Sequence, residues 1–295
     1  MFRSLSDRTV LHNGVLLPWL GIALRRPSGP RDLRQTVDAA IDAGVRGFEV
    51  DMDDGGAAEF GVALRASGIP RREFFISLRV SGGEYGYAQT REAFDRVQER
   101  LGLGQLDLML LNRPSVARFP DAWQALEELA CEGRVRALGV VDCGIGELRE
   151  MLARASLRPT VNQVAAYPAL GQRALSQFCA SENIQLRAAS PLSGGRILRH
   201  PTLAALAQGH GRTAAQVALR GLLQRDLPSV TATADPAHIR EIVGVFDFHL
   251  TPEDLAQLGQ IHASPVAEPA AGNTRAARWA GLLGGGRKVA VATAA

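Results

Sequence analysis

Residues 106–141 read LDLMLLN (106–112), FPDAWQALEELACEG (119–133) and VRALGVV (135–141), with short connections between the three segments. The two apolar runs have the length of buried strands. The segment between them places apolar residues at helical spacing and ends at a glycine. A strand, a helix and a second strand in this order predict two parallel strands joined by a crossover helix.

The same alternation continues in both directions along the chain. Apolar runs that suit buried strands recur, separated by amphipathic segments, at WLGIA (19–23), RGFEV (46–50), FFISLRV (74–80), LDLMLLN (106–112), VRALGVV (135–141), PTVNQV (159–164), IQLRAA (184–189) and PSVTAT (228–233). Eight strands that alternate with eight helices are typical of a (β/α)8 TIM barrel. The sequence therefore predicts an α/β protein of this class.

The two ends of the chain extend this prediction. TVLHNGVLLP (9–18) contains Asn13-Gly14, a pair that favours a tight turn, and predicts a β-hairpin that caps the bottom of the barrel. A last helix, TPEDLAQLGQI (251–261), closes the barrel domain, which we expect over residues 1–262. Residues 263–295 are rich in Ala, Gly and Pro and predict a C-terminal tail that is partly mobile.

Composition excludes several classes of function. The net charge is +3, with 33 basic and 30 acidic residues interleaved along the chain, which does not indicate a nucleic-acid-binding surface. Three cysteines fit neither a disulfide framework nor a metal site, and we expect buried free thiols. The N-terminus lacks a signal-peptide pattern and no run reaches transmembrane length. These features predict a soluble, cytoplasmic protein that does not bind membranes.

Several segments carry a family resemblance, among them LHNGVLLPWLGIAL (11–24), LGLGQLDLMLLNRP (101–114), PTVNQVAAYP (159–168) and ASPLSGGRIL (189–198). In this order and spacing the chain resembles an aldo-keto reductase from about residue 9 to 262. The resemblance implies a barrel that binds NADPH or NADH and reduces carbonyl groups. In that family a tyrosine donates a proton to the carbonyl, a lysine and an aspartate tune the tyrosine, and a histidine orients the substrate.

All four of those catalytic positions are substituted in this chain. Glu49 falls on the aspartate, Asp54 on the tyrosine, Arg79 on the lysine and Asn112 on the histidine. The single lysine of the sequence, Lys288, lies in the tail. An ionised Asp54 repels the negative charge that develops on a carbonyl oxygen during reduction, and an arginine cannot be tuned as a lysine can. Conventional reduction is therefore not expected.

The cofactor positions are partly retained. According to the resemblance, five residues match positions that hold the nicotinamide amide, the pyrophosphate and the adenine: Asn162, Gln163, Ser190, Leu192 and Glu241. Ala189 replaces the tyrosine that stacks on the nicotinamide, and Ala232 and His238 replace cations beside the 2′-phosphate. A phosphate without cationic partners binds weakly. We interpret the five matches as vestigial and expect no cofactor, with NADPH or NADH required if the protein is a reductase.

Charged residues gather instead at the predicted mouth. Arg25 and Arg113 replace pocket tryptophans of the family and, with Arg79, predict binding of a small anionic molecule. Glu49 and Asp54 are the expected acid/base pair, with Arg79 and Asn112 beside them and Tyr167 as a possible proton donor on the opposite wall. The same charges are also compatible with an ion-pair network that fills an inactive site. The nearby arginines argue against a bound metal.

Three functions are compatible with these observations. The first is a repurposed, cofactor-independent enzyme of the lyase or isomerase type, which catalyses an elimination, isomerisation, cyclisation or condensation, as in a biosynthetic pathway. The second is a non-catalytic binding or scaffolding protein, and the third is an atypical NAD(P)H-dependent oxidoreductase. Because one fold hosts many chemistries, the geometry of the site must discriminate among them.

Overall fold

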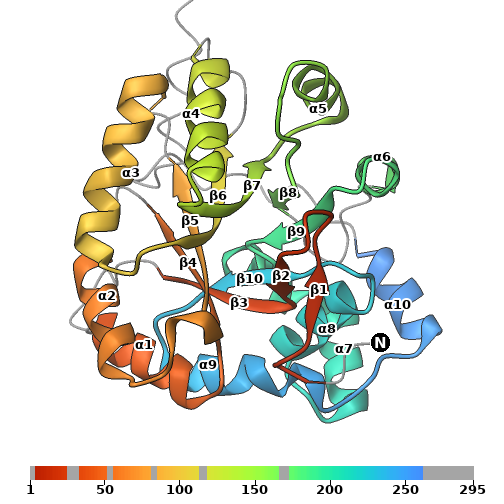
Figure 1. The fold of residues 1–295 in the computed structure, drawn as a ribbon. Coiled ribbons are helices and arrows are strands. Elements are labelled where there is room, and N and C mark those ends of the chain that lie inside the picture. The colour runs from red at the N-terminus through yellow and green to blue at the C-terminus, as the bar shows by residue number, and fades with distance from the viewer. Residues whose placement is uncertain are drawn as a thin grey trace, which may run out of the picture. The chain divides into compact units, whose positions relative to one another are not determined.

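The barrel is closed by eight parallel strands. The structure is a computed structural model that describes residues 4–24, 33–51, 56–80, 85–112, 118–165 and 173–261 of the 295-residue chain. The strands follow one another around the barrel in chain order (Figure 1): β3 Leu20–Leu24, β4 Gly47–Asp51, β5 Phe75–Val80, β6 Leu106–Asn112, β7 Val135–Val141, β8 Val161–Ala165, β9 Gln185–Ala189 and β10 Ser229–Ala232. All eight coincide with predicted strands to within two residues at either end, so the predicted fold class is confirmed.

The helices form a ring outside the strands (Figure 1). They are α1 Leu33–Asp42, α2 Ala57–Ala66, α3 Tyr87–Leu101, α4 Phe119–Cys131, α5 Ile145–Leu152, α6 Arg173–Ser181, α7 Pro201–His210, α8 Ala214–Leu223, α9 Pro236–Val243 and α10 Pro252–Gly259, with short 3-10 helices at Arg71–Glu73 (η1), Ser193–Arg199 (η3) and Gly244–Phe246 (η4). Two helices, α7 and α8, lie between β9 and β10, so α7 is an addition to the simple alternation.

Two apolar layers follow from the alternation of side chains along the strands. One face of each strand packs against the helices, as Phe48 does against Phe60 of α2. The other face points into the barrel, where Phe75 and Leu108 belong to a second buried cluster. The lower barrel is therefore a filled core, and ligand chemistry is confined to the carboxyl ends of the strands.

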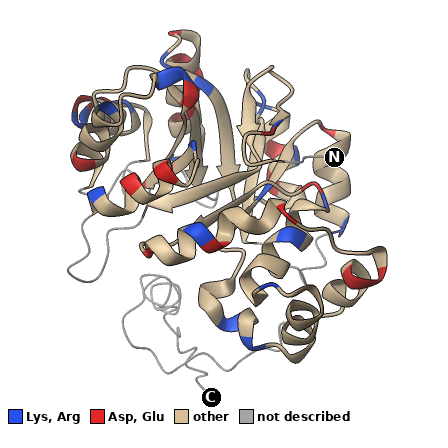
Figure 2. Ribbon diagram, turned by 90° about the horizontal axis from the view of Figure 1, so that it is seen from below, with Lys and Arg blue, Asp and Glu red and all other residues tan. Residues whose placement is uncertain are grey.

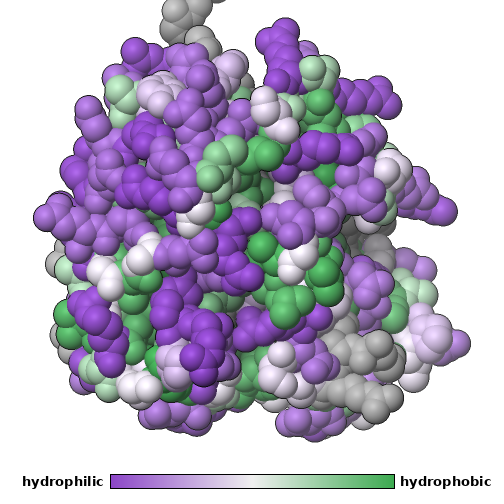
Figure 3. All heavy atoms as spheres, viewed as in Figure 1, coloured by the Kyte–Doolittle hydropathy of each residue, from purple (hydrophilic) through white to green (hydrophobic). Residues whose placement is uncertain are grey.

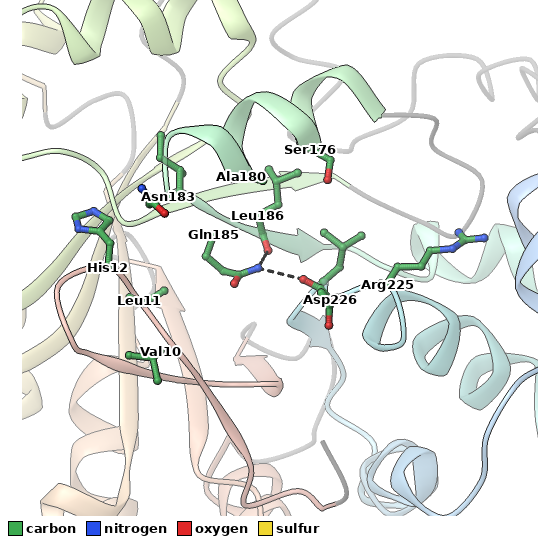
Figure 4. Close-up of a pocket in the computed structure, with 12 residues that line it drawn as sticks. Val10, Leu11, His12, Ser176, Ala180, Asn183, Gln185, Leu186, Arg225 and Asp226 are labelled. Atoms are coloured by element: carbon green, nitrogen blue, oxygen red, sulfur yellow. Dashed lines mark hydrogen bonds between the residues drawn. The ribbon is translucent and has the colours of Figure 1, made fainter. Parts of the chain in front are cut away.

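The predicted hairpin closes the bottom of the barrel. Its strands are β1 Arg8–Val10 and β2 Leu16–Pro18, and Gly14 adopts a φ of 83° in the turn between them. Leu11, Val15 and Leu17 join the interior cluster, and the Asn13 amide donates a 3.0 Å hydrogen bond to the Arg136 carbonyl. Beside the hairpin lies a cavity of about 460 Å³, at the end of the barrel opposite the mouth. Residues of α6 and β9 line it (Figure 4).

Charge is distributed evenly over the barrel domain. Basic and acidic segments alternate around the ribbon rather than gathering by sign (Figure 2). Within the described residues, no helix combines the length and apolarity needed to cross a membrane.

The cysteines differ from the expectation in one respect. All three are free, and Cys143 and Cys179 are buried, but Cys131 is exposed because it ends α4 on the solvent side. Burial raises the pKa of the Cys179 thiol to about 11.

Ellman's reagent should therefore modify one thiol of the native protein quickly and all three after unfolding, because only an exposed thiolate reacts. Cys131→Ser should remove the fast phase. Rapid modification of either remaining thiol in the native state of that variant would contradict the burial of Cys143 and Cys179.

Candidate functional site at the mouth of the barrel

An ion pair occupies the ends of two neighbouring strands. Asp51 ends β4, Arg79 lies near the end of β5, and the two residues are direct partners in the parallel register. Arg79 donates from Nε to Asp51 Oδ1 at 2.6 Å and from Nη2 to Asp51 Oδ2 at 2.8 Å. The side chains are 23% and 34% exposed, so this two-bond pair is accessible from the mouth. Asn112 ends the next strand, β6, and is half-buried.

The electrostatic surroundings keep Arg79 charged. Burial lowers the pKa of its guanidinium, but the carboxylates of Asp51, Glu49 and Asp142 outweigh burial, and the pKa is raised above its usual value. A guanidinium in this state is a permanent cation and cannot take part in proton transfer.

Glu49 does not face the mouth. Its side chain is only 4% exposed and points into the barrel, where it meets Arg187 from β9 on the opposite wall. Arg187 Nη1 lies 3.2 Å from Glu49 Oε2 and 3.1 Å from Gln163 Oε1, and Gln163 Nε2 donates to Glu49 Oε1 at 3.1 Å. Ser77 Oγ lies 3.4 Å from the same Nη1. A buried cation thus holds the Glu49 carboxylate in the interior of the barrel, and the expected acid/base role of Glu49 stays a prediction.

Space for Arg187 comes from a glycine. A Cβ atom on Gly21 of β3 would lie 3.1 Å from Arg187 Nη2, so a larger residue there would push against the guanidinium. Arg187 itself is 1% exposed, and burial lowers its pKa while Glu49 opposes that shift. Sequence reasoning missed Arg187 because it lies within the apolar run IQLRAA. The sequence did contain a signal, because Arg187 alternates with Gln185 and Ala189 on one face of a predicted barrel strand, and that face points into the barrel.

Tyr85 is a buried residue that contacts the backbone at the end of β6. Its hydroxyl donates to the backbone carbonyl of Asn112, and its ring is 4% exposed. Burial, followed by the neighbouring Cys143, raises the pKa of the Tyr85 hydroxyl well above its usual value. Tyr85 is thus a structural residue, and Tyr87, which lies on the surface of α3 and bonds Glu128, does not reach the mouth.

Tyr85→Phe should cost about 1 kcal/mol of unfolding free energy at pH 7, because one hydrogen bond is lost. Above about pH 10 the unfolded wild type ionises this tyrosine while the folded protein does not, so wild-type stability should fall as pH rises. Urea unfolding between pH 7 and 11 should show a shallower alkaline decline for Tyr85→Phe. Parallel declines would contradict the buried, neutral hydroxyl.

The two amides predicted to hold a nicotinamide are engaged by the protein itself. Asn162 and Gln163 are both fully buried. Asn162 donates to the Cys143 carbonyl at 2.8 Å and accepts from the Cys143 amide at 3.3 Å. Gln163 belongs to the Glu49–Arg187 network. Neither amide is presented to a ligand in this arrangement.

The remaining matched residues lie at the rim. Ser190 follows β9 with a φ of 49° and is exposed, and its carbonyl accepts a turn hydrogen bond from Ser193. Leu192 packs between two core clusters, and Glu241 lies on α9, where its carbonyl accepts from Gln216. These contacts give the turn after β9 and the helix α9 a structural role.

Several predicted residues lie outside the described part of the chain. They are Arg25, Asp54, Arg113 and Tyr167, and their roles stay predictions. Over the described ranges, no group of three or more His, Cys, Asp or Glu side chains is arranged to hold a metal ion.

Comparison with known proteins identifies the family. The model of the aldo/keto reductase family matches residues 21–263, which include all of the barrel except the first residue of β3. The chain belongs to this family. Its fold is shared with a solved aldo-keto reductase, MGS-M4, from a deep-sea metagenome library, with a TM-score of 0.81 and 32% identity over 85% of this chain and 93% of that one.

Characterised relatives of this family member include named reductases. Glyoxal reductase of Bacillus subtilis is 35% identical over 266 residues, which cover 90% of this chain and 96% of the relative. The 9,11-endoperoxide prostaglandin H2 reductase of Trypanosoma cruzi is 35% identical over 255 residues, 85% of this chain and 90% of the relative. The aldo-keto reductase frame is therefore retained over almost the full length of these enzymes.

Proposed function

We propose that this aldo-keto reductase family member has lost conventional carbonyl reduction and catalyses a redox-neutral reaction on a small anionic molecule at the barrel mouth. The observation that carries this proposal is the half-exposed Asp51–Arg79 pair. It puts a carboxylate base and a permanent cation at the position where the family resemblance implies a tunable lysine. Eliminations, isomerisations, cyclisations and condensations that pass through an enolate use such a base beside a group that holds the developing oxyanion.

The loss of reduction rests on the absence of a suitable proton donor among the described mouth residues. Arg79 cannot give up its proton, and the Tyr85 hydroxyl is buried against the Asn112 carbonyl. The resemblance places Asp54 on the tyrosine position, where an ionised carboxylate opposes the charge that forms on a reduced carbonyl.

The residues present do not fit the nicotinamide that the family implies. The side-chain amide of Gln163 forms hydrogen bonds with Glu49 and Arg187, and that of Asn162 donates to the Cys143 carbonyl. Ala232 and His238 offer no strong cation to a 2′-phosphate. No step of the proposed reaction therefore uses a nicotinamide.

In this proposal Asp51 takes the role that the sequence assigned to Glu49. Asp51 removes a proton next to a carboxylate or carbonyl group of the ligand. Two of the five N–H groups of Arg79 bond Asp51, and Arg79 holds the resulting oxyanion with the others. Asn112 offers an amide from the adjoining strand. Asp54, Tyr167, Arg25 and Arg113 remain candidates for the return of the proton and for anion binding.

Two measurements on the purified protein test the proposal. Calorimetric titration with NADPH and NADH should show no micromolar binding, and glyoxal or benzaldehyde should cause no NADPH consumption above background. A thermal-shift screen should favour carboxylic acids over amides or alcohols of similar size, because the mouth carries arginine. Equal stabilisation by acids and neutral isosteres would refute the anionic substrate class.

An atypical NAD(P)H-dependent oxidoreductase is the second candidate. The 35% identity with glyoxal reductase over 90% of the chain favours it. Micromolar NADPH binding together with aldehyde-dependent oxidation that is abolished by Asn162→Ala would establish this function and overturn the redox-neutral proposal.

A further inference from the structure

A groove runs between helices α4 and α5 on the outer ring, away from the mouth pair. Its volume is about 590 Å³, and it shows as a hollow between the two helices in Figure 3, with hydrophobic atoms on its floor. The floor is formed by Phe119, Trp123, Met151 and Ala155. Grooves of this size and composition between helices are typical of binding sites.

Contacts within the floor hold the groove open. The rings of Phe119 and Trp123 are nearly parallel, with centroids 6.3 Å apart. Glu127 Oε1 accepts from the Trp123 indole at 2.9 Å and from the Leu157 amide at 2.8 Å. One carboxylate thus fixes the aromatic ring and also ties the segment after α5 to α4, so the separation of the helices is a property of the fold.

The rim of the groove is acidic. Glu127, Glu147 and Glu150 line it together with a single basic side chain, Arg154. Glu147 caps α5 through the Gly144 amide, whereas Glu150 is exposed on the next turn. An apolar floor between carboxylates complements a ligand that carries large apolar groups flanked by positive charge.

We propose that this groove, lined along α4 from Phe119 to Glu127, docks a short basic amphipathic helix of a partner protein. The nine residues from Phe119 to Glu127 span about 12 Å along α4, or two helical turns, which accommodates apolar anchors at positions i and i+4 of a bound helix. Arg or Lys residues of the partner would lie against Glu147 and Glu150.

A fluorescein-labelled 14-residue peptide with two leucine anchors at i and i+4 and four flanking arginines is the probe. Fluorescence anisotropy at 50 mM salt should show micromolar binding, at least tenfold tighter than that of the same peptide with glutamates in place of arginines. Glu150→Lys should weaken binding roughly 5- to 10-fold, and Ala155→Trp should weaken it further by filling the groove. The matched control is Glu253→Lys on α10, which makes the same charge change at an exposed site and should leave binding unchanged.

Circular dichroism confirms that each variant is folded. The proposal is overturned if the arginine and glutamate peptides bind equally, if no binding occurs at 1 mM peptide, or if Glu253→Lys weakens binding as much as Glu150→Lys. It is also overturned if sedimentation shows that the chain self-associates and that Glu150→Lys abolishes this association, since a second copy then occupies the groove.

Discussion

Arg187→Met is expected to lower the unfolding free energy by about 3–5 kcal/mol, because it leaves Glu49 as an unpaired charge in the barrel interior. The two side chains are 2% and 4% exposed, so solvent cannot replace the lost partner. Gln163 also loses the donor that holds its carbonyl oxygen. Urea unfolding monitored by circular dichroism measures the effect.

The double variant Glu49→Leu/Arg187→Met provides the control. Removing both charges should recover most of the lost stability, since apolar residues often replace a buried pair without penalty. Arg79→Met at the half-exposed mouth pair should cost only about 1 kcal/mol or less. If Arg187→Met were no more destabilising than Arg79→Met, the buried network would not have the energetic role inferred from its geometry.

Asp51→Asn is expected to lower turnover of the reactive acid found by the thermal-shift screen by a factor of about 10² to 10⁴, the usual cost of removing a general base. The amide keeps the size of the side chain but cannot accept a proton. Stability should change little, because the pair is partly exposed. Steady-state kinetics should show the loss in kcat rather than in KM.

The variant Glu49→Gln tests whether the two carboxylates of β4, Glu49 and Asp51, have different roles. This variant should lose stability through the Arg187 network and keep its kcat when assayed well below its unfolding temperature. The reverse pattern, with full activity in Asp51→Asn and a large loss of kcat in Glu49→Gln, would return the acid/base role to Glu49 and contradict the assignment of Asp51.

The sequence was sufficient for the barrel because its signals are local. Eight apolar runs, the Asn13-Gly14 turn and glycines at helix ends each determine a strand, a hairpin or a helix end with little help from distant residues. The position of Arg79 at the mouth followed from its place near the end of β5. Family resemblance then supplied the expected roles of the residues at the mouth.

Pairing among the charges could not be predicted in the same way. Glu49 and Asp51 are two residues apart and both point inward, but one is a layer deeper in the barrel than the other. Which of them meets solvent depends on Arg187, a residue 138 positions away that crosses the barrel to Glu49. Likewise, the resemblance gave the position of Gln163 but not its hydrogen bonds, which go to Glu49 and Arg187 from two other strands.

The crossing of the barrel by Arg187 also limits which substitutions the barrel tolerates. If Glu49 were replaced by the shorter aspartate, its carboxylate would lie one methylene farther from Arg187. The guanidinium would then lose its partner, so we expect this single change to lower the stability of the fold. Replacement of Arg187 alone is penalised as well. Each single change is therefore expected to destabilise the fold, whereas a change of both residues together is expected to avoid most of that cost. The buried pair therefore couples the two positions, so that a change at one is tolerated only together with a change at the other.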